Sequence, residues 1–377
     1  MLRQHTEPRP DWPKRVESQG MLYHSLDDVP YWDESCYYKF TLQQIDALEQ
    51  ATLELNDLCL EAIQQIIDSD AWLDRLDIPR EFHDWIRHSW EHDEHTLYGR
   101  FDFAYDGYGA PKLLEYNADT PTSLLEAAVI QWHWLKDKFP HAQQFNSIHE
   151  RLIEAFQMLK HEYQMKRFYF CSVDTIEDSM TVHYLRDVAI QAGILTQFLN
   201  VGQIGWNTSR NLFTDLDERV IEYCFKLYPW EWMLREEFGK NLPKSPTKWF
   251  EPPWKSLLSN KGILPVLWQL FPQCPYLLES SFEPFADQTY VRKPLFSREG
   301  SNIEIYNQGS LVFGTPGPYD DGSFVYQRIH PLPHFEGRYY PIIGRWIVIG
   351  WACGIGIRED ESPVTGNLSR FVPHLFE

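Results

Sequence analysis

Residues 100–117 combine an arginine, two carboxylates and an asparagine at a spacing that could hold a divalent cation. Glycine, aspartate and proline at residues 106–111 predict a loop, and the runs on either side predict the two strands of a β-hairpin. If Tyr105 pairs with Lys112, side-chain alternation gives the hairpin one apolar and one polar face. The apolar face then holds Phe101, Phe103, Leu114 and Tyr116. The polar face holds Arg100, Asp102, Glu115 and Asn117.

The polar face predicts a magnesium site. Asp102 would lie opposite Glu115, and two carboxylates within about 5 Å at Cβ repel each other unless something compensates. Arg100, a raised pKa or a bound cation could do so. With the Asn117 carbonyl, the carboxylates form an oxygen-only set, which suits Mg²⁺ better than zinc. A solvent-exposed face with a local Arg100–Asp102 pair is the alternative, and the pattern leaves both open.

A turn rich in hydroxyl groups follows the second strand, at residues 118–123, and a predicted helix at 123–136 comes after it. Thr122 or Ser123 could cap that helix. The helix N-terminus would then be an anion site beside the cation site.

Other helices and strands must position these groups. Apolar periodicity predicts helices at 41–69, 80–93 and 148–165, a Trp-rich helical stretch at 217–239, and a partly helical stretch at 255–271 that breaks at Pro265. A strand at 167–173, a helix at 178–192 and a strand at 194–199 predict a βαβ unit, hence an α/β part. Residues 27–33 are predicted to form a loop. Six tryptophans are expected mainly in the core: Trp206, Trp230, Trp232, Trp249, Trp254 and Trp268.

Acidic residues follow the first strand of that unit, where open α/β sheets place ligands. They are Asp174, Glu177 and Asp178. Ordinary acidic charge at a helix N-terminus is the alternative.

The last third of the chain predicts strands at 289–294, 302–306, 324–329 and two within 340–357 that join near Gly350. The polar loop 297–302 could turn backbone N–H groups toward an anion, although an ordinary hairpin turn is the alternative. It is not a Walker A loop, because that motif is absent. Arg358 could form a plain salt bridge or donate to a transferring phosphoryl group.

Composition limits the possible classes of protein. The chain has 377 residues, 43% of them hydrophobic, which gives a prior of two or three domains. A net charge of −20 argues against nucleic-acid binding. Six scattered cysteines, none in a C-x-x-C pair, indicate free thiols in a reducing compartment. Because no apolar run could span a bilayer, we expect no membrane partner and a cytoplasmic location.

Together these segments resemble the synthetase domain of glutathionylspermidine synthases, and more closely the stand-alone bacterial acid–amine ligase homologues of that domain. The matching runs are Arg-Phe-Asp-Phe at 100–103, Lys-Leu-Leu-Glu-Tyr-Asn-Ala-Asp-Thr-Pro-Thr at 112–122, Lys-Pro-Leu-Phe-Ser-Arg-Glu-Gly-Ser-Asn at 293–302, Tyr-Gln at 326–327 and Gly-Ile-Arg-Glu-Asp at 356–360. The resemblance covers nearly the whole chain.

The resemblance implies an ATP-grasp-like fold with a permuted order of elements, within an α/β (α+β) class. Three parts are expected: residues 1–165 with the N-terminal helices and the hairpin, 166–250 as an α/β substrate-side domain, and 251–377 as the nucleotide-binding part. The implied activity is an ATP-dependent ligase that joins a carboxylate to an amine and uses two Mg²⁺ ions. The acid could be a peptide such as glutathione and the amine a polyamine.

Site residues are implied by position. The Mg²⁺ ligands would be Asp102, Glu115 and Asn117. The acid substrate would contact Arg100, Thr120 and Thr122, and the amine would lie near Glu177. Arg100 and Arg358 would act on the transferring phosphoryl group. ATP would be held by Lys261, Lys293, the loop residues Glu299, Gly300, Ser301 and Asn302, and the adenine neighbours Gln327, Arg328 and Ile329.

The sequence departs from the family in two ways. Bifunctional glutathionylspermidine synthases carry an N-terminal cysteine amidase domain, whereas this chain begins at the synthetase, so we expect no amidase activity. Thr120 and Thr122 stand where the family commonly has serine, and their extra methyl groups narrow the acid pocket.

The alternative function is that of a nucleotide-binding or regulatory protein whose ligase scaffold has lost its catalytic activity.

Overall fold

A computed structural model describes residues 1–26, 29–319, 322–367 and 369–377. The chain forms a mixed α/β structure, which confirms the predicted class, whereas the permuted ATP-grasp order and the three-part division stay predictions. The loop predicted at 27–33 includes Asp27 and Asp28, which lie outside the described residues.

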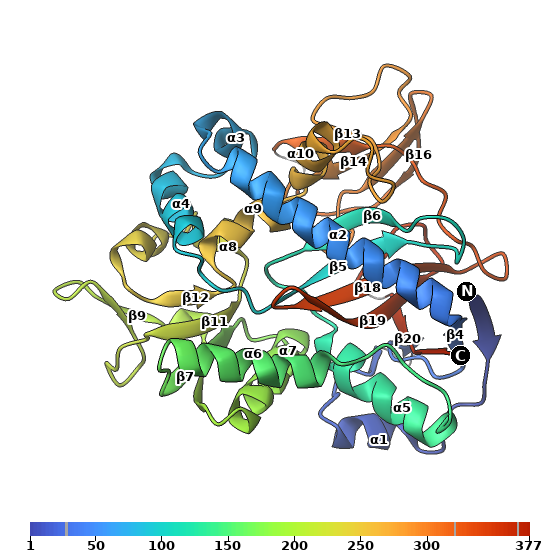
Figure 1. The fold of residues 1–377 in the computed structure, drawn as a ribbon, viewed down its shortest axis with the longest axis horizontal. Helices are drawn as coiled ribbons and strands as arrows, with labels where there is room; N and C mark the ends of the chain where they lie inside the picture. The colour runs from blue at the N-terminus through green and yellow to red at the C-terminus, as the bar shows by residue number, and fades with distance from the viewer. Residues whose placement is uncertain (27–28, 320–321, 368) are drawn as a thin grey trace.

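The central sheet has five antiparallel strands in the order β20-β19-β18-β5-β6. They are β20 (Arg370–Val372), β19 (Trp351–Asp360), β18 (Tyr340–Val348), β5 (Tyr98–Ala104) and β6 (Lys112–Asn117). β18 and β19 meet at Ile349 and Gly350, both with positive φ, as predicted for the turn near Gly350. Figure 1 shows that this sheet brings the hairpin against strands from the last part of the chain.

A second, parallel sheet lies beside it in the order β12-β11-β7-β8. Its strands are β12 (Lys248–Phe250), β11 (Tyr223–Leu227), β7 (Arg167–Ser172) and β8 (Leu195–Asn200). The helix α7 (Ile176–Gln191) connects β7 to β8, which confirms the βαβ unit, and α6 (Ile148–Glu162) packs against α7. β9 (Gly205–Asn207) and β10 (Leu212–Thr214) form a separate short hairpin.

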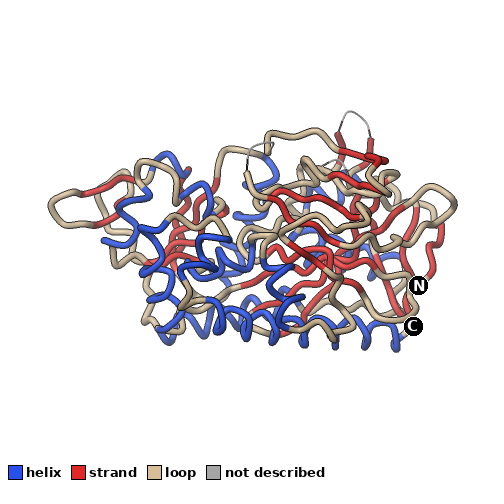
Figure 2. Tube along the Cα trace, turned by 90° about the horizontal axis from the view of Figure 1, so that it is seen from above, coloured by secondary structure: helices blue, strands red, loops and turns tan. Residues whose placement is uncertain are grey.

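The third large sheet, in the order β13-β17-β14-β15-β16, comes from the last third of the chain. Its strands are β13 (Ser280–Ser281), β17 (Phe324–Gln327), β14 (Tyr290–Pro294), β15 (Glu304–Asn307) and β16 (Ser310–Gly314). At the chain ends, β1 (Leu2–His5) and β21 (His374–Phe376) both pair with β4 (Cys36–Phe40), so the two termini lie side by side (Figures 1 and 2). β2 (Ser25–Leu26) and β3 (Val29–Pro30) form a small pair.

The long helix α2 (Leu42–Ile66) crosses the central sheet and buries an apolar face that includes Leu48, Leu55 and Ile63 (Figure 1). It begins at a capping box of Thr41 and Gln44. Figure 2 shows many of the helices along one edge of the molecule. The other helices are α1 (Trp12–Ser18), α3 (Asp70–Arg75), η1 (Arg80–Phe82), α4 (His83–Glu91), the π-helix η2 (Glu126–Ile130), α5 (Gln131–Lys138), η3 (Val201–Gln203), α8 (Trp230–Met233), η4 (Gly239–Lys244), η5 (Pro253–Lys255), α9 (Ser256–Ser259) and α10 (Ile263–Leu270).

Two helix predictions are wrong. Residues 217–239 are not one helix, because β11 inserts between β7 and β12, where apolar side chains are covered on both faces of a parallel sheet. Only the short helix α8 follows. Pro265 does not break α10, because it is the third residue of that helix, where its missing N–H would have had no partner.

The tryptophan prediction holds except at one position. Trp230, Trp249 and Trp254 are buried, and Trp206 and Trp268 pack partly buried against the core. Trp232 is 41% exposed and lines a cavity, so the core expectation is wrong there. The six cysteines are free thiols, as predicted. Among the residues that the structure describes, no helix has the length and apolarity needed to cross a membrane.

Candidate active site

The hairpin register agrees with the prediction at the polar positions. Asp102 pairs with Glu115 and Arg100 with Asn117. A β-bulge after Asp102 then shifts the pairing, so Phe103 faces Leu113. The prediction that Leu114 joins the apolar face is therefore wrong: Leu113 is buried in the core, and Leu114 lines a cavity.

Positive groups compensate the two facing carboxylates. Arg100 donates to both oxygens of Asp102, from Nε at 2.7 Å and from Nη2 at 3.0 Å. Lys261 Nζ lies 2.9 Å from Glu115 Oε2. The Asn117 amide donates to Asp102 at 2.9 Å and to Glu115 at 3.2 Å. Because Asp102 is only 7% exposed, this face is not an open surface.

The two carboxylates differ in acidity. Burial raises the pKa of Asp102, although Arg100 opposes that rise. Burial also pushes the pKa of Glu115 upward, but Lys261 and Lys293 outweigh it and hold that pKa at about 2. Glu115 is therefore an anion over the whole physiological range.

Two cavities meet at this carboxylate pair. The first has a volume of about 190 Å³ and the second of about 250 Å³, and both are lined by Asp102, Glu115 and Gly300. The first cavity is mainly polar, and its predicted residues are Arg100, Asp102, Glu115, Asn117, Thr120, Thr122, Glu177, Glu299, Gly300 and Arg358. The second is mainly apolar, and its predicted residues are Asp102, Glu115, Lys261, Lys293, Gly300, Gln327, Arg328 and Ile329.

Two predicted residues lie outside both linings, Ser301 and Asn302. They pack instead beneath residues 315–319: the Oδ1 of Asn302 accepts from the Tyr319 N–H at 2.9 Å. Gly300, beside them, has a φ of +66° and lies against the Thr365 carbonyl. The loop 297–302 therefore packs on the loop 361–367 where the cavities meet.

Lys293 stands in the wall of the second cavity, on β14. It is 7% exposed, and its Nζ donates to Gln327 Oε1 at 2.7 Å and to the Leu114 carbonyl at 2.9 Å. Burial lowers the pKa of Lys293 to about 8, although Glu115 opposes that change. This lysine is a cation held close to the carboxylate pair.

The turn after the hairpin supplies the floor of the first cavity. Arg100 donates to the Thr122 carbonyl at 2.8 Å, and Thr120 Oγ1 accepts from Arg298 at 2.8 Å. The capping prediction is wrong: Ser123 has a φ of +66°, and its hydroxyl contacts Tyr31 and Arg358 instead. Asp119, directly before Thr120 in this turn, is fully buried and forms an ion pair with Lys226 at 2.6 Å.

The start of α7 faces the same cavity. Thr175 caps this helix through the Asp178 N–H, and Glu177 and Asp178 line the first cavity. Burial raises the pKa of Asp178 to about 6. Asp174 lines a different cavity, next to α1 and α7.

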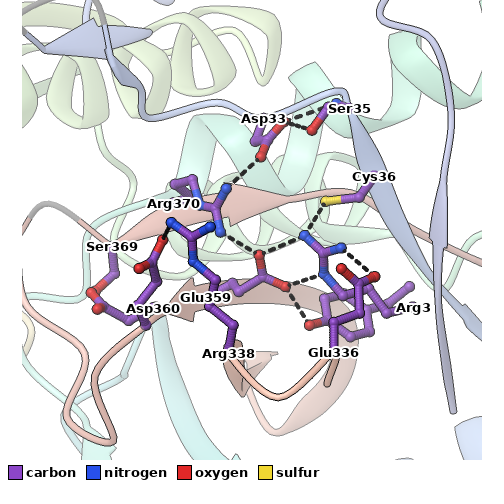
Figure 3. Close-up of polar contacts among 12 residues, drawn as sticks. Arg3, Asp33, Ser35, Cys36, Glu336, Arg338, Glu359, Asp360, Ser369 and Arg370 are labelled. Atoms are coloured by element: carbon purple, nitrogen blue, oxygen red, sulfur yellow. Dashed lines mark hydrogen bonds and ion pairs between the residues drawn. The ribbon is translucent and has the colours of Figure 1, made fainter. Parts of the chain in front are cut away.

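Arg358 reaches the first cavity from β19. Its Nε donates to the Ser369 carbonyl at 3.0 Å and its Nη2 to the Gly366 carbonyl at 2.8 Å. Side chains alternate along a strand, so the next residue, Glu359, points to the other side of the sheet. Figure 3 shows Glu359 between Arg3 and Arg370, which donate to it at 2.8 Å each. This buried cluster ties β19 to the N-terminal strands and fixes the base of Arg358.

Sequence reasoning missed several residues of the first cavity. Arg298 binds Glu231 as well as Thr120, although it lies inside the motif that carried the resemblance. Tyr228 and Trp232 also line this cavity, from a stretch assigned to a helix. Of these residues, only Arg298 could have been found from the sequence, because it lies in the predicted polar loop 297–302.

The donor set fits a hard divalent cation. No group of three or more His, Cys, Asp or Glu side chains arranged around a metal is found within the described ranges. A Mg²⁺ site needs fewer protein ligands, because the ion takes one or two carboxylates and completes its coordination shell with water and phosphate oxygens. The carboxylates of Asp102 and Glu115 provide such a set. Asn117 contacts both of them through Nδ2, so its carbonyl oxygen would join the set once the amide group turned over.

Comparisons with known proteins identify the family. The model of the family described as glutathionylspermidine synthase preATP-grasp matches residues 3–377. A Haemophilus influenzae protein named "Putative acid--amine ligase" is 42% identical over 98% of this chain and 97% of its own length. The bifunctional glutathionylspermidine synthetase/amidase of Escherichia coli is 28% identical over 95% of this chain and 61% of that protein. The trypanothione synthetase of Crithidia fasciculata is 29% identical over 84% of this chain and 53% of that protein. This chain therefore belongs to the glutathionylspermidine synthase preATP-grasp family.

Proposed function

We propose that this chain is an ATP- and Mg²⁺-dependent ligase that joins a small-molecule carboxylate to an amine through an acylphosphate. Family membership supports amide formation, since the relatives named above include glutathionylspermidine and trypanothione synthetases. The observation that carries the proposal is the meeting of a polar and an apolar cavity at Asp102 and Glu115. With the nucleotide in the apolar cavity and the carboxylate in the polar one, the phosphoryl group would pass between them where the two cavities meet.

Asp102, Glu115 and Asn117 would hold Mg²⁺, which would neutralise phosphate oxygens during the transfer. In the apolar cavity, Gln327, Arg328 and Ile329 would border the adenine. Lys261 and Lys293 would bind the phosphates, and the residues of loop 299–302 would close over them. Lys261 now pairs with Glu115, so nucleotide binding would exchange that partner for phosphate oxygens.

The acid substrate would lie in the polar cavity against Arg100, Thr120 and Thr122. A carboxylate is unreactive toward amines because its oxygen leaves poorly, so it must first accept the γ-phosphoryl group. Arg100 and Arg358 would stabilise negative charge on that group as it moves. The neutral amine would then attack the acyl carbon and expel phosphate, and the protein would act mainly by positioning the two reactants.

We propose a peptide carboxylate, with glutathione as the first candidate, and a polyamine such as spermidine as the amine. The names of the relatives suggest this pair. Glu177 and Asp178 give the polar cavity negative charge that suits a cationic amine. The methyl groups of Thr120 and Thr122 narrow the acid side, so a smaller carboxylate is the second candidate.

The test is product formation with Mg²⁺ and ATP. The protein is incubated with glutathione and spermidine, and in parallel with a metabolite pool, and amides and ADP are detected by mass spectrometry. Glu115→Gln should abolish turnover and retain the fold. Glu304→Gln is the matched control, because Glu304 is also ion-paired, with Arg292 at 2.7 Å, but lies outside both cavities. Full activity of Glu115→Gln refutes the metal role, and Mg²⁺ATP binding without any product favours the regulatory alternative.

A further inference from the structure

A buried carboxylate beneath the polar cavity is linked to the cavity wall by two hydroxyl groups. Glu126 and Ser123 are each 2% exposed and Tyr31 is 4% exposed. The Tyr31 hydroxyl donates to Glu126 Oε1 at 2.9 Å and lies 3.0 Å from Ser123 Oγ. Ser123 lines the polar cavity, whereas Glu126 does not. The proposed ligase steps above assign no role to these three residues.

The chain of hydrogen bonds has one direction. When Glu126 is ionised, Tyr31 gives its single hydroxyl proton to that carboxylate, so the Tyr31 oxygen accepts the proton of Ser123. Ser123 Oγ then has acceptor capacity left on its cavity side. Arg358 Nη1 lies 3.5 Å from this oxygen, which places Ser123 beside the proposed phosphoryl site.

The backbone at these positions is unusual. Ser123 adopts a φ of +66°, which residues with a Cβ rarely do, and such strain concentrates at functional sites. Glu126 begins the π-helix η2, and π-helical turns are rare and frequently found at functional sites. With this backbone, the side chains of Ser123 and Glu126 both contact the Tyr31 hydroxyl.

The charge around Glu126 suits a proton acceptor. Burial and, to a smaller extent, the charge of Glu177 on α7 raise the pKa of Glu126, which is about 7. The hydrogen bond from its own backbone N–H, the hydrogen bond from Tyr31 and the charge of Arg358 on β19 oppose that rise. A general base works best when its pKa lies near the working pH.

We propose that Ser123, Tyr31 and Glu126 form a proton relay that receives the proton of the attacking amine. This inference rests on the proposed ligase function. The bound amine arrives as an ammonium ion, and one of its protons passes to Ser123 Oγ as the Ser123 proton passes to Tyr31 and the Tyr31 proton to the Glu126 carboxylate. The neutral nitrogen then bonds to the acyl carbon, the bond from that carbon to the phosphate oxygen breaks, and phosphate leaves with the electron pair and takes up the second proton that the nitrogen loses. Ser123 touches the substrate, and Tyr31 and Glu126 act through it.

The kinetic test compares two nucleophiles with glutathione, Mg²⁺ and ATP. Spermidine amines are protonated at neutral pH and must lose a proton, whereas hydroxylamine is neutral and needs no base before it attacks. In Glu126→Gln and Tyr31→Phe, amide formation with spermidine should fall about 100-fold, and its rise in kcat with pH near 7 should disappear. Hydroxamate formation should remain within a factor of about two of the wild-type rate, because the acylphosphate still forms.

The control is Tyr184→Phe, which removes a buried tyrosine hydroxyl that contacts His149 away from both cavities. It should leave both reactions unchanged. If the wild type makes no hydroxamate with glutathione or with any acid of the metabolite pool, the proposed ligase function fails. Wild-type hydroxamate combined with unaltered spermidine kinetics in Glu126→Gln overturns the relay alone.

A measurement without substrate tests the relay independently. Infrared difference spectra of the free protein between about pH 5.5 and about pH 9 should show a protonated carboxylic acid that ionises near pH 7. That band should be absent from Glu126→Gln and shifted in Tyr31→Phe, which removes its hydrogen-bond donor. A wild-type spectrum without such a band, or a band unaffected by Glu126→Gln, also overturns the relay.

Discussion

The ion pair between Asp119 and Lys226 gives the sharpest stability prediction. Both side chains are fully buried, with 2.6 Å between Asp119 Oδ1 and Lys226 Nζ. Lys226 Nζ also donates to the Tyr228 carbonyl at 3.0 Å, and Asp119 Oδ2 accepts from the Trp230 N–H at 2.9 Å. The pair therefore joins the turn after β6 to β11 and the residues that follow it, and both segments contribute lining residues to the polar cavity.

Removal of one partner leaves an uncompensated buried charge. For Lys226→Met, and separately for Asp119→Asn, we expect a loss of about 3–5 kcal/mol in the free energy of unfolding. The double variant has no buried charge at this place. It should be more stable than the sum of the two single losses predicts, with a coupling of about 2 kcal/mol or more.

Guanidinium denaturation at neutral pH measures these values. The control cycle uses the exposed pair of Asp74 and Arg80, which should show no measurable coupling.

The pH dependence of the stability of Asp119→Asn is a second check. Burial lowers the pKa of Lys226 below its ordinary 10.5, and without Asp119 that pKa falls further. The loss in Asp119→Asn should therefore shrink as the pH rises toward 10.5, and additive losses with no such recovery would refute the reasoning.

Three further predictions concern other parts of the site. Because burial raises the pKa of Glu126 from 4.5 to about 7, the protein should lose about 3 kcal/mol of stability as the pH rises from about 4.5 to about 7, and Glu126→Gln should remove that slope in denaturation curves. In Gly300→Ala, the new Cβ would lie 2.3 Å from the Thr365 carbonyl, so the KM for ATP should rise about tenfold, whereas Gly309→Ala, with a φ of +79° but no neighbour closer than 3.8 Å, should leave it unchanged. Glu359→Leu removes the buried carboxylate that Arg3 and Arg370 share and leaves them only their second partners, Glu336 and Asp33, so it should lower the free energy of unfolding by about 3 kcal/mol in the same assay; a wild-type value would contradict the cluster in Figure 3.

Local pattern predicted the hairpin and its polar register, because alternation is a property of each strand alone. It could not predict the bulge after Asp102, because burial of Leu113 against the distant helices and strands of the core decides that shift. The strand at 223–227 was missed for a similar reason. Its aromatic and apolar residues suit a helix or a buried strand equally well, and only the neighbouring strands β7 and β12 decide.

The other residues that the sequence analysis did not identify make contacts with residues far away in the sequence. Arg3 meets Glu359 across 356 positions, and Tyr31 meets Glu126 across 95. No spacing rule links such residues, because the folded chain alone brings them together. The resemblance supplied cavity residues such as Lys293 and Gln327, whose roles the spacing in the sequence does not indicate.

Transfer of an oxygen atom tests the central claim most directly. If the carboxylate of the acid accepts the γ-phosphoryl group, one of its oxygens leaves with phosphate when the amine attacks. Wild-type protein incubated with Mg²⁺, ATP, spermidine and glutathione labelled with ¹⁸O in its carboxylates should therefore release inorganic phosphate that carries one ¹⁸O atom. Amide formed together with unlabelled phosphate would contradict the acylphosphate, and with it the account of why two cavities meet at Asp102 and Glu115.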